Sequence, residues 1–169
     1  MAGRLVAALA ASALFGAAAM AQEATATAKF VGADGAEIGS ATLTETPAGV
    51  LVEAEVSGLP AGQWVGFHFH ENGTCDHQSG HESAGGHFNP DGKEHGYNSA
   101  NGPHAGDMPN QHVDAEGMLH AQVLNTFVSL AEGANSVKGR ALMIHGGPDD
   151  YESQPSGKAG DRIACAVVE

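Results

Sequence analysis

The sequence predicts an all-β protein, a sandwich or barrel of about eight short strands. Several segments alternate apolar and polar residues with a period of two, the pattern of a strand that buries one face. Glycine- and proline-rich turn signals separate these segments roughly every ten residues, as in sandwiches and barrels. Glycine occurs 24 times, aromatic residues make up 5% of the chain, and no segment has a convincing helical period.

Residues 1–21 have the pattern of an export signal. Arg4 precedes a long run of alanine, leucine and valine, which ends at "AMA", a small-x-small cleavage pattern. A transmembrane anchor is the alternative, but the alanine-rich run and its cleavage pattern favour removal. Residues 22–169 would then form one domain of ordinary size.

The clearest expected strand is "GVLVEAEVSGL", residues 49–59, whose small apolar residues alternate with Leu51 and two glutamates. The other expected strands are "ATAKFVG", "AEIGSATLTET", "GQWVGFHFHE", "QHVDAEGMLHAQVLN", "GRALMIH" and "RIACAVV". A tight turn is expected at Ala115-Glu116-Gly117, inside "QHVDAEGMLHAQVLN". Two long loops, about 71–109 and 146–161, interrupt this series. A structureless loop of roughly forty residues counts against a compact domain unless the loop is functional.

Charge and cysteine content narrow the class of protein. The chain has 7 Lys and Arg against 20 Asp and Glu, a net charge of −13, so nucleic acid and anionic membranes are poor candidate partners. Cys75 and Cys165 are the two cysteines, and an exported protein with an even count can hold a disulfide. Closing that loop would stabilise the fold by roughly 4 kcal/mol. Two free buried thiols are the less favoured alternative.

His68 and His70 lie one residue apart in "GFHFHE". Residues i and i+2 of a strand share a face, so burying Phe67 and Phe69 in the core turns both imidazoles to the other side. Two such imidazoles can chelate one metal ion. Two surface histidines on an edge strand explain the pattern about equally well.

The first long loop favours the interpretation that the histidines bind metal. It carries His87, His95, His104 and Asp107, and three nitrogens with one carboxylate oxygen are a plausible tetrahedral zinc set. A bound ion would also order the loop, because the binding free energy contributes to folding. The alternative is a histidine-rich loop in solvent, which four candidate ligands in 21 residues make less attractive.

Three residues near the second loop complete the candidate site. His145 ends the strand "GRALMIH", and Asp149 four residues later could accept hydrogen bonds from ligand imidazoles. Arg162, one of three arginines, lies three residues before Cys165. An ordinary turn at Asp149 and a solvated Arg162 are the alternatives.

Taken together, "GFHFHE", "GGHFNP", "GPHAGD", "IHGGPDD" and "GKAGDRIAC" resemble, in this order, the copper/zinc superoxide dismutase family. The resemblance covers about residues 28–168 and implies an exported bacterial member. It also implies the family's fold, an eight-stranded antiparallel Greek-key sandwich or barrel of immunoglobulin-like type with two long functional loops.

The resemblance implies one copper and one zinc ion per chain. The implied copper ligands are His68, His70, His87 and His145, and the implied zinc ligands are His87, His95, His104 and Asp107. His87 would bridge both metals and, with Arg162, would be catalytic. Asp149 would link the two sites through hydrogen bonds, and Cys75 and Cys165 would form the family's disulfide.

The implied reaction is the disproportionation of superoxide to oxygen and hydrogen peroxide in the periplasm, where it would protect against superoxide. Nothing after the signal resembles a membrane anchor. The chain could be a monomer or a homodimer, since Trp64 and the outer strand faces could be interface or plain surface. The copper loading route and the physiological source of superoxide are not encoded in any motif.

Some residues depart from the family pattern or match none of its motifs. Asp161, beside Arg162, stands where the family usually has a small residue, and it could weaken the local field or pair with Lys158. Four histidines match no ligand motif and are expected at the surface: His77, His81, His112 and His120. They could titrate near neutral pH, and His77 and His81 could capture copper.

Three rival functions remain. A non-catalytic copper or zinc buffer on the same fold would be expected to lack a copper ligand or the arginine. A histidine-rich exported domain without metal would have to match the motif spacings by chance. A hydrolytic zinc enzyme would need an open zinc position and a general base, and the inferred zinc shell is full.

Overall fold

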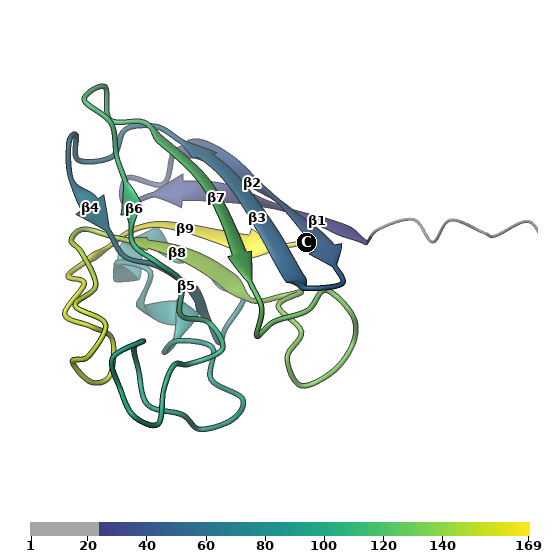
Figure 1. Cartoon of the computed structure of the whole chain (residues 1–169). Coiled ribbons are helices and arrows are strands. Elements are labelled where there is room, and N and C mark those ends of the chain that lie inside the picture. The colour runs from purple at the N-terminus through teal and green to yellow at the C-terminus, as the bar shows by residue number, and fades with distance from the viewer. Residues whose placement is uncertain (1–23) are drawn as a thin grey trace, which may run out of the picture.

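The computed structural model describes residues 24–169 as a curled antiparallel sheet with a small two-stranded sheet beside it (Figure 1). The predicted export signal lies outside the described residues. The large sheet has the strand order β5-β8-β9-β1-β2-β3-β7. Its strands are β1 (Thr25–Gly32), β2 (Glu37–Thr46), β3 (Gly49–Val56), β5 (Phe67–His70), β7 (Leu119–Asn125), β8 (Ala141–His145) and β9 (Arg162–Val168). The small sheet pairs β4 (Trp64–Val65) with β6 (Gln111–His112).

Period-two alternation places the core on the inner face of the curled sheet. In β3 the buried residues are Val50, Val52, Ala54 and Val56, and β7 has the same alternation. The sheet curls so that buried side chains of strands far apart in the order meet in one hydrophobic cluster. The expected all-β class is therefore confirmed.

One expected strand is divided in the structure, which gives nine strands among the described residues instead of about eight. The turn expected at Ala115-Glu116-Gly117 lies between β6 and β7, as predicted. "GQWVGFHFHE" breaks at Gly66, where the chain passes close to the second loop. A Cβ on Gly66 would lie 3.0 Å from the Cβ of Ala159. The N–H of Gly66 donates to the Gly147 carbonyl at 2.8 Å. β4 thus leaves the large sheet, while β5 continues in it with the two histidines.

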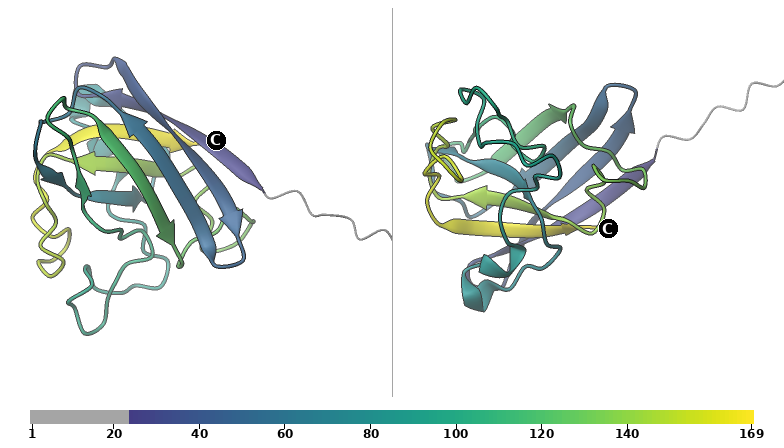
Figure 2. Two further views of the ribbon diagram at one scale, coloured as in Figure 1. Left: turned by 45° about the horizontal axis from the view of Figure 1, so that its top comes forward. Right: turned by 90° about the horizontal axis from the view of Figure 1, so that it is seen from below.

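The first long loop contains two short 3₁₀ turns that the sequence did not predict, η1 (His77–Ser79) and η2 (Glu82–Ala84). Figure 1 shows the rest of this loop in teal below the sheet and the second loop in yellow-green at the left. Both loops lie next to β5 and β8, whereas the two turns lie on the β9 side (Figure 2, right). Within residues 24–169 no helix has the length and apolar character needed to cross a membrane.

Candidate metal centre

Strand β5 places two histidines on one side and two phenylalanines on the other. Phe67 and Phe69 join the hydrophobic core with 0% exposure, as the alternation predicted. His68 and His70 lie on the opposite side but are also fully buried, and residues of the two long loops contact them: Asp149 contacts His68, and Gly85 contacts His70. The imidazoles therefore point into the interior of a site and not into solvent.

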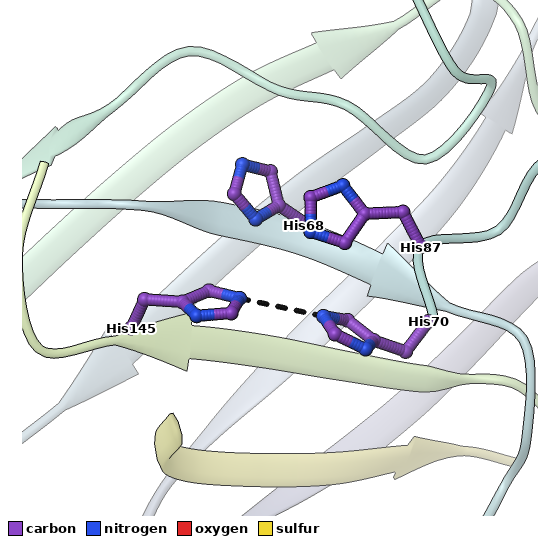
Figure 3. Close-up of side chains that lie close together, drawn as sticks. All are labelled: His68, His70, His87 and His145. Carbon is purple, nitrogen blue, oxygen red and sulfur yellow. Dashed lines mark hydrogen bonds between the residues drawn. The ribbon is translucent and has the colours of Figure 1, made fainter. Parts of the chain in front are cut away.

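His145 and His87 complete a set of four imidazoles, which we call the four-histidine group (Figure 3). His145 ends β8, the strand paired with β5, and its Nε2 lies 3.3 Å from Nε2 of His70. His87 comes from the first loop and forms an isolated β-bridge with His70. One nitrogen from each of the four rings lies within 4.8 Å of the others.

Three of these rings are oriented by hydrogen bonds from the nitrogen that faces away from the group. Such bonds fix which ring nitrogen carries the proton and leave the other free to bind a metal. The donors and acceptors are His68 Nε2 to Asp149 Oδ2 (2.9 Å), His70 Nδ1 to the Gly85 carbonyl (3.0 Å) and His145 Nδ1 to the Gly160 carbonyl (3.4 Å). The group therefore presents unprotonated nitrogens to its centre.

A second set, which we call the carboxylate group, consists of His87, His95, His104 and Asp107. Its imidazoles converge on one atom, Oδ1 of Asp107. Their Nδ1 atoms lie 2.9 Å (His87), 3.1 Å (His95) and 3.5 Å (His104) from it. Tetrahedral zinc with bonds of about 2.0–2.2 Å separates its ligand atoms by roughly 3.3–3.6 Å, so this set needs only a small expansion to form a zinc shell.

Asp149 connects the two groups. Its Oδ2 accepts from His68 at 2.9 Å and its Oδ1 accepts from His95 at 3.0 Å, so one carboxylate contacts a member of each group. The Asn110 side chain holds the Asp149 backbone by donating to its carbonyl and accepting from its N–H, both at 2.8 Å. A Cβ on Gly157 would lie 1.8 Å from Oδ1 of Asp149, so only glycine fits beside this carboxylate.

Burial sets the protonation of the four-histidine group. Desolvation lowers the pKa of His87 from 6.5 to about 4 and that of His145 to about 2, and the positive charge of neighbouring imidazoles acts in the same direction. The pKa of His70 is also lowered, first by burial and then by His87. These rings are neutral at pH 7, which is the state that binds metal.

The carboxylate group has the opposite balance. Burial alone would lower the pKa of His95, but hydrogen bonds with Asp107 and Asp149 outweigh it and raise the pKa to about 9. Burial would raise the pKa of the Asp107 and Asp149 carboxyl groups, but the surrounding imidazoles hold both well below the usual range. Without metal, His95 is therefore a buried cation between two carboxylates, and a bound cation would replace its proton.

Three buried nitrogens without hydrogen-bond partners show that the residues fit metal ions: His68 Nδ1, His87 Nε2 and His104 Nδ1. A buried polar atom without a partner costs free energy, and coordination would satisfy it. His87 directs Nδ1 to Asp107 and leaves Nε2 for the four-histidine group. Four nitrogens suit copper, and three nitrogens with one oxygen suit zinc.

A cleft of about 840 Å³ leads to the four-histidine group. His70, His87 and His145 line it together with Arg162, whose side chain is 15% exposed. NH1 of Arg162 donates to the His81 carbonyl at 3.0 Å, and NH2 lies 3.5 Å from a carboxylate oxygen of Glu82. The guanidinium is thus a fixed positive charge at the entrance.

The predicted disulfide between Cys75 and Cys165 is present, with a Cα–Cα distance of 5.5 Å. Residues 75–84, which contain the two 3₁₀ turns, are called the η1–η2 segment from here on. The disulfide joins the start of this segment to β9, three residues beyond Arg162. The segment that supplies the His81 carbonyl is therefore tied covalently to the strand that carries the guanidinium.

The structure corrects two sequence-based expectations. His81, expected at the surface, is fully buried, because the η1–η2 segment folds back against the sheet. Lys158 lies 3.8 Å from Asp150, so its ion pair is with this residue and not with Asp161. Asn110 was missed entirely, since its contacts with Asp149 span 39 residues and leave no local signal.

Comparisons with known proteins agree with this arrangement. The copper/zinc superoxide dismutase family model matches residues 37–168. "Superoxide dismutase [Cu-Zn] 1" of Aquifex aeolicus is 51% identical, over 89% of this chain and 90% of its own length. The corresponding protein of Caulobacter vibrioides is 38% identical, over 86% of each chain.

Solved structures show the same fold. Copper/zinc superoxide dismutase from Brucella abortus superposes with a TM-score of 0.72 at 30% identity, over 86% of this chain and 100% of that one. A superoxide dismutase-like protein from Bacillus subtilis gives 0.76 at 34% identity, over 83% and 95%. The chain belongs to the copper/zinc superoxide dismutase family. It is accordingly an oxidoreductase whose cofactors are copper and zinc.

Proposed function

We propose that the four-histidine group holds copper, that the carboxylate group holds zinc, and that the chain disproportionates superoxide to oxygen and hydrogen peroxide. One observation carries the assignment. His87 belongs to both groups, with Nδ1 lying 2.9 Å from Oδ1 of Asp107 and Nε2 buried without a partner. An imidazole that loses both ring protons can bind two metal ions at once, one through each nitrogen.

A bound copper ion supplies the alternation between Cu(II) and Cu(I) that dismutation requires, whereas zinc is redox-silent. The protein supplies the proton position. Nε2 of His87 has no protein partner, so it is free to take a proton and release it during the reaction. Asp107 keeps the ring in place from the opposite side, because Nδ1 remains directed at its carboxylate.

Arg162 is the residue proposed to attract superoxide. Net charge argues against an anionic substrate, since the chain carries −13. A local positive charge in a cleft can nevertheless concentrate an anion, because the low-dielectric walls focus its field. Arg162 lines the cleft with three imidazoles of the four-histidine group, so the anion would be drawn toward the open side of the proposed copper site.

The location proposed for this activity is the bacterial periplasm, after removal of residues 1–21. The disulfide supports an oxidising compartment, since cytosolic thiols are kept reduced. Protection of that compartment against superoxide is the corresponding proposed role.

Metal content and activity test the proposal together. Purified protein should contain about one copper and one zinc ion per chain by elemental analysis. Selective copper removal should abolish dismutation, and added copper should restore it. His87→Gln should lose activity and both metals, while His120→Gln, on the exposed face of β7, should keep them. Zinc alone, with no activity after copper is offered, would indicate a metal buffer.

A further inference from the structure

His81 is a buried histidine that neither proposed metal group uses. Its exposed fraction is 0%, and neither ring nitrogen has a hydrogen-bond partner. Burying an unpaired polar side chain costs free energy. The backbone at His81 also has φ of 61°, a left-handed conformation that residues other than glycine adopt at some cost. Both costs require a compensating role.

The contacts of His81 point to the nearby guanidinium. Its carbonyl accepts from NH1 of Arg162 at 3.0 Å, and the next residue, Glu82, places a carboxylate oxygen 3.5 Å from NH2. The His81 N–H donates to the Asp76 carbonyl at 2.9 Å, which closes the turn on the other side. The His81 carbonyl and the Glu82 carboxylate thus hold the Arg162 guanidinium in place.

The side chain of His81 is buried beside the end of β1. Its ring lies near enough to the Gly32 carbonyl for this carbonyl to raise its pKa, although neither ring nitrogen makes a hydrogen bond. His77 of the same segment lies against the following turn, with ring atoms 2.9 Å from the position of a Cβ on Gly35. The η1–η2 segment therefore contacts the β1–β2 end through two histidines, and of these His81 is the fully buried one.

We propose that the buried imidazole of His81 is a positioning residue for Arg162. It anchors the segment whose His81 carbonyl and Glu82 carboxylate hold the guanidinium at the cleft. The proposal rests on the proposed role of Arg162 in attracting superoxide. The disulfide ties the beginning of the segment at Cys75, but the Arg162 contacts lie six residues further on, so a second anchor is needed there.

The surroundings of His81 favour the neutral ring. Burial lowers its pKa below the ordinary 6.5, and His77 and Arg162 act in the same direction. Asp76 and the Gly32 carbonyl oppose this without cancelling it. The anchored ring stays neutral, whereas a ring released from the anchor takes up a proton below about pH 6.5. The released state is therefore favoured more and more as the pH falls below 6.5, and the anchor weakens. The hold on Arg162 should therefore weaken in mild acid.

Two variants separate the side chain from the backbone. His81→Gly suits the left-handed backbone but removes the anchor, so the proposal expects Arg162 to be released. His81→Gln keeps a neutral polar side chain that does not titrate, so it should retain Arg162 and remove the pH dependence. His120→Gln removes an exposed histidine far from the cleft and serves as the matched control.

The measurement is the side-chain Nε–H NMR signal of Arg162 in the metal-loaded protein with copper kept reduced. Residues 22–169 contain a second arginine, Arg140, which donates to the Glu71 carbonyl and stacks on the Phe88 ring at 4.8 Å. Arg140 is therefore an internal reference. In the wild type the Arg162 signal should move between about pH 8 and pH 5 in step with the His81 ring. In His81→Gln the Arg162 signal should not change over this pH range.

In His81→Gly the Arg162 signal should resemble that of a free side chain, and azide, a small anion probe, should bind about tenfold more weakly. An unchanged Arg162 signal in a folded His81→Gly protein would overturn the proposal. If the His81→Gly protein does not fold, His81→Gln provides the test. An Arg162 signal that changes with pH in His81→Gln as it does in the wild type would also overturn the proposal. Full activity of Arg162→Ala would instead refute the proposed function of Arg162 and leave the His81 coupling intact.

Discussion

The two metal-binding groups share His87 but are stabilised in different ways. The four-histidine group takes no ligand atom from a carboxylate, and three of its members lie on the paired strands β5 and β8. The carboxylate group lies in the first loop and converges on Asp107 Oδ1. The strands therefore position His70 and His145 with neutral carbonyl partners alone, whereas the imidazoles of the loop gather around a charged carboxylate.

Removing the central carboxylate should have the largest effect. Asp107→Ala leaves a buried His95 cation without one of its two partners, which costs about 3–5 kcal/mol of unfolding free energy in the metal-free protein. Zinc should be lost as well. Urea unfolding and elemental analysis check both. Asp91→Ala, an exposed change in the same loop, is the control, and retention of zinc by Asp107→Ala would contradict the proposed ligand set.

Asp149→Asn should affect both groups at once. The amide has one acceptor oxygen, so it can satisfy His68 or His95 but not both donors. Affinity for both metals should fall about 10–100-fold in chelator competition, as for other residues that orient ligands. Asp150→Asn at the exposed neighbouring position should leave both affinities unchanged. A loss confined to one metal would mean that Asp149 does not couple the groups.

The pH dependence of the metal-free protein should differ between the groups. The pKa of His87 is lowered to about 4, so the unfolded chain binds more protons below 6.5 and stability falls as pH drops from 6.5 toward 4. The pKa of His95 is raised to about 9, so its contribution is complete below 6.5 and is lost as pH rises through 9. The change in unfolding free energy across each of these two pH ranges should be about 3 kcal/mol.

Urea unfolding across this range should therefore give a maximum near neutral pH. His95→Gln should remove the alkaline decline and leave the acid decline, because only the carboxylate group contains the raised pKa. An alkaline decline that persists in this variant would show that another group is responsible.

The smallest effect is expected at the cleft entrance. Asp161 lines the cleft beside Arg162 and is not neutralised by Lys158, which pairs with Asp150. Asp161→Ser should raise the dismutation rate at low salt about twofold, because one repelling charge is removed. The gain should vanish at high salt, and Glu116→Ser at a distant turn should show none. An unchanged rate and salt slope would refute this role for Asp161.

The sequence predicted the strands and the members of both groups for different reasons. Period-two alternation in β3 reports burial directly, because each residue's face follows from its neighbours. The metal-binding residues were found through short motifs whose spacing resembles a known family. Neither signal reaches contacts between distant segments, which explains why Asn110 was not predicted. The pair of Lys158 and Asp150 lies within the second loop, which has no periodicity from which a contact could be predicted.

His81 and Gly66 illustrate the same limit. A histidine among polar loop residues has the composition of a surface position, and only the closure of the η1–η2 segment on β1 buries it. Gly66 interrupts an otherwise regular alternation because the second loop passes within 3.0 Å of its side-chain position. Both outcomes depend on where another part of the chain lies.

Gly157 has a consequence for how variants of this chain should be judged. In the sequence it is the first residue of the motif "GKAGDRIAC", where nothing assigns it a role. Its missing side chain leaves the space that the Asp149 carboxylate and the His95 ring occupy, with a Cβ predicted 1.8 Å and 2.6 Å from their atoms. In a saturation mutagenesis screen, this position should be as intolerant as a metal ligand, although it donates no atom to either ion.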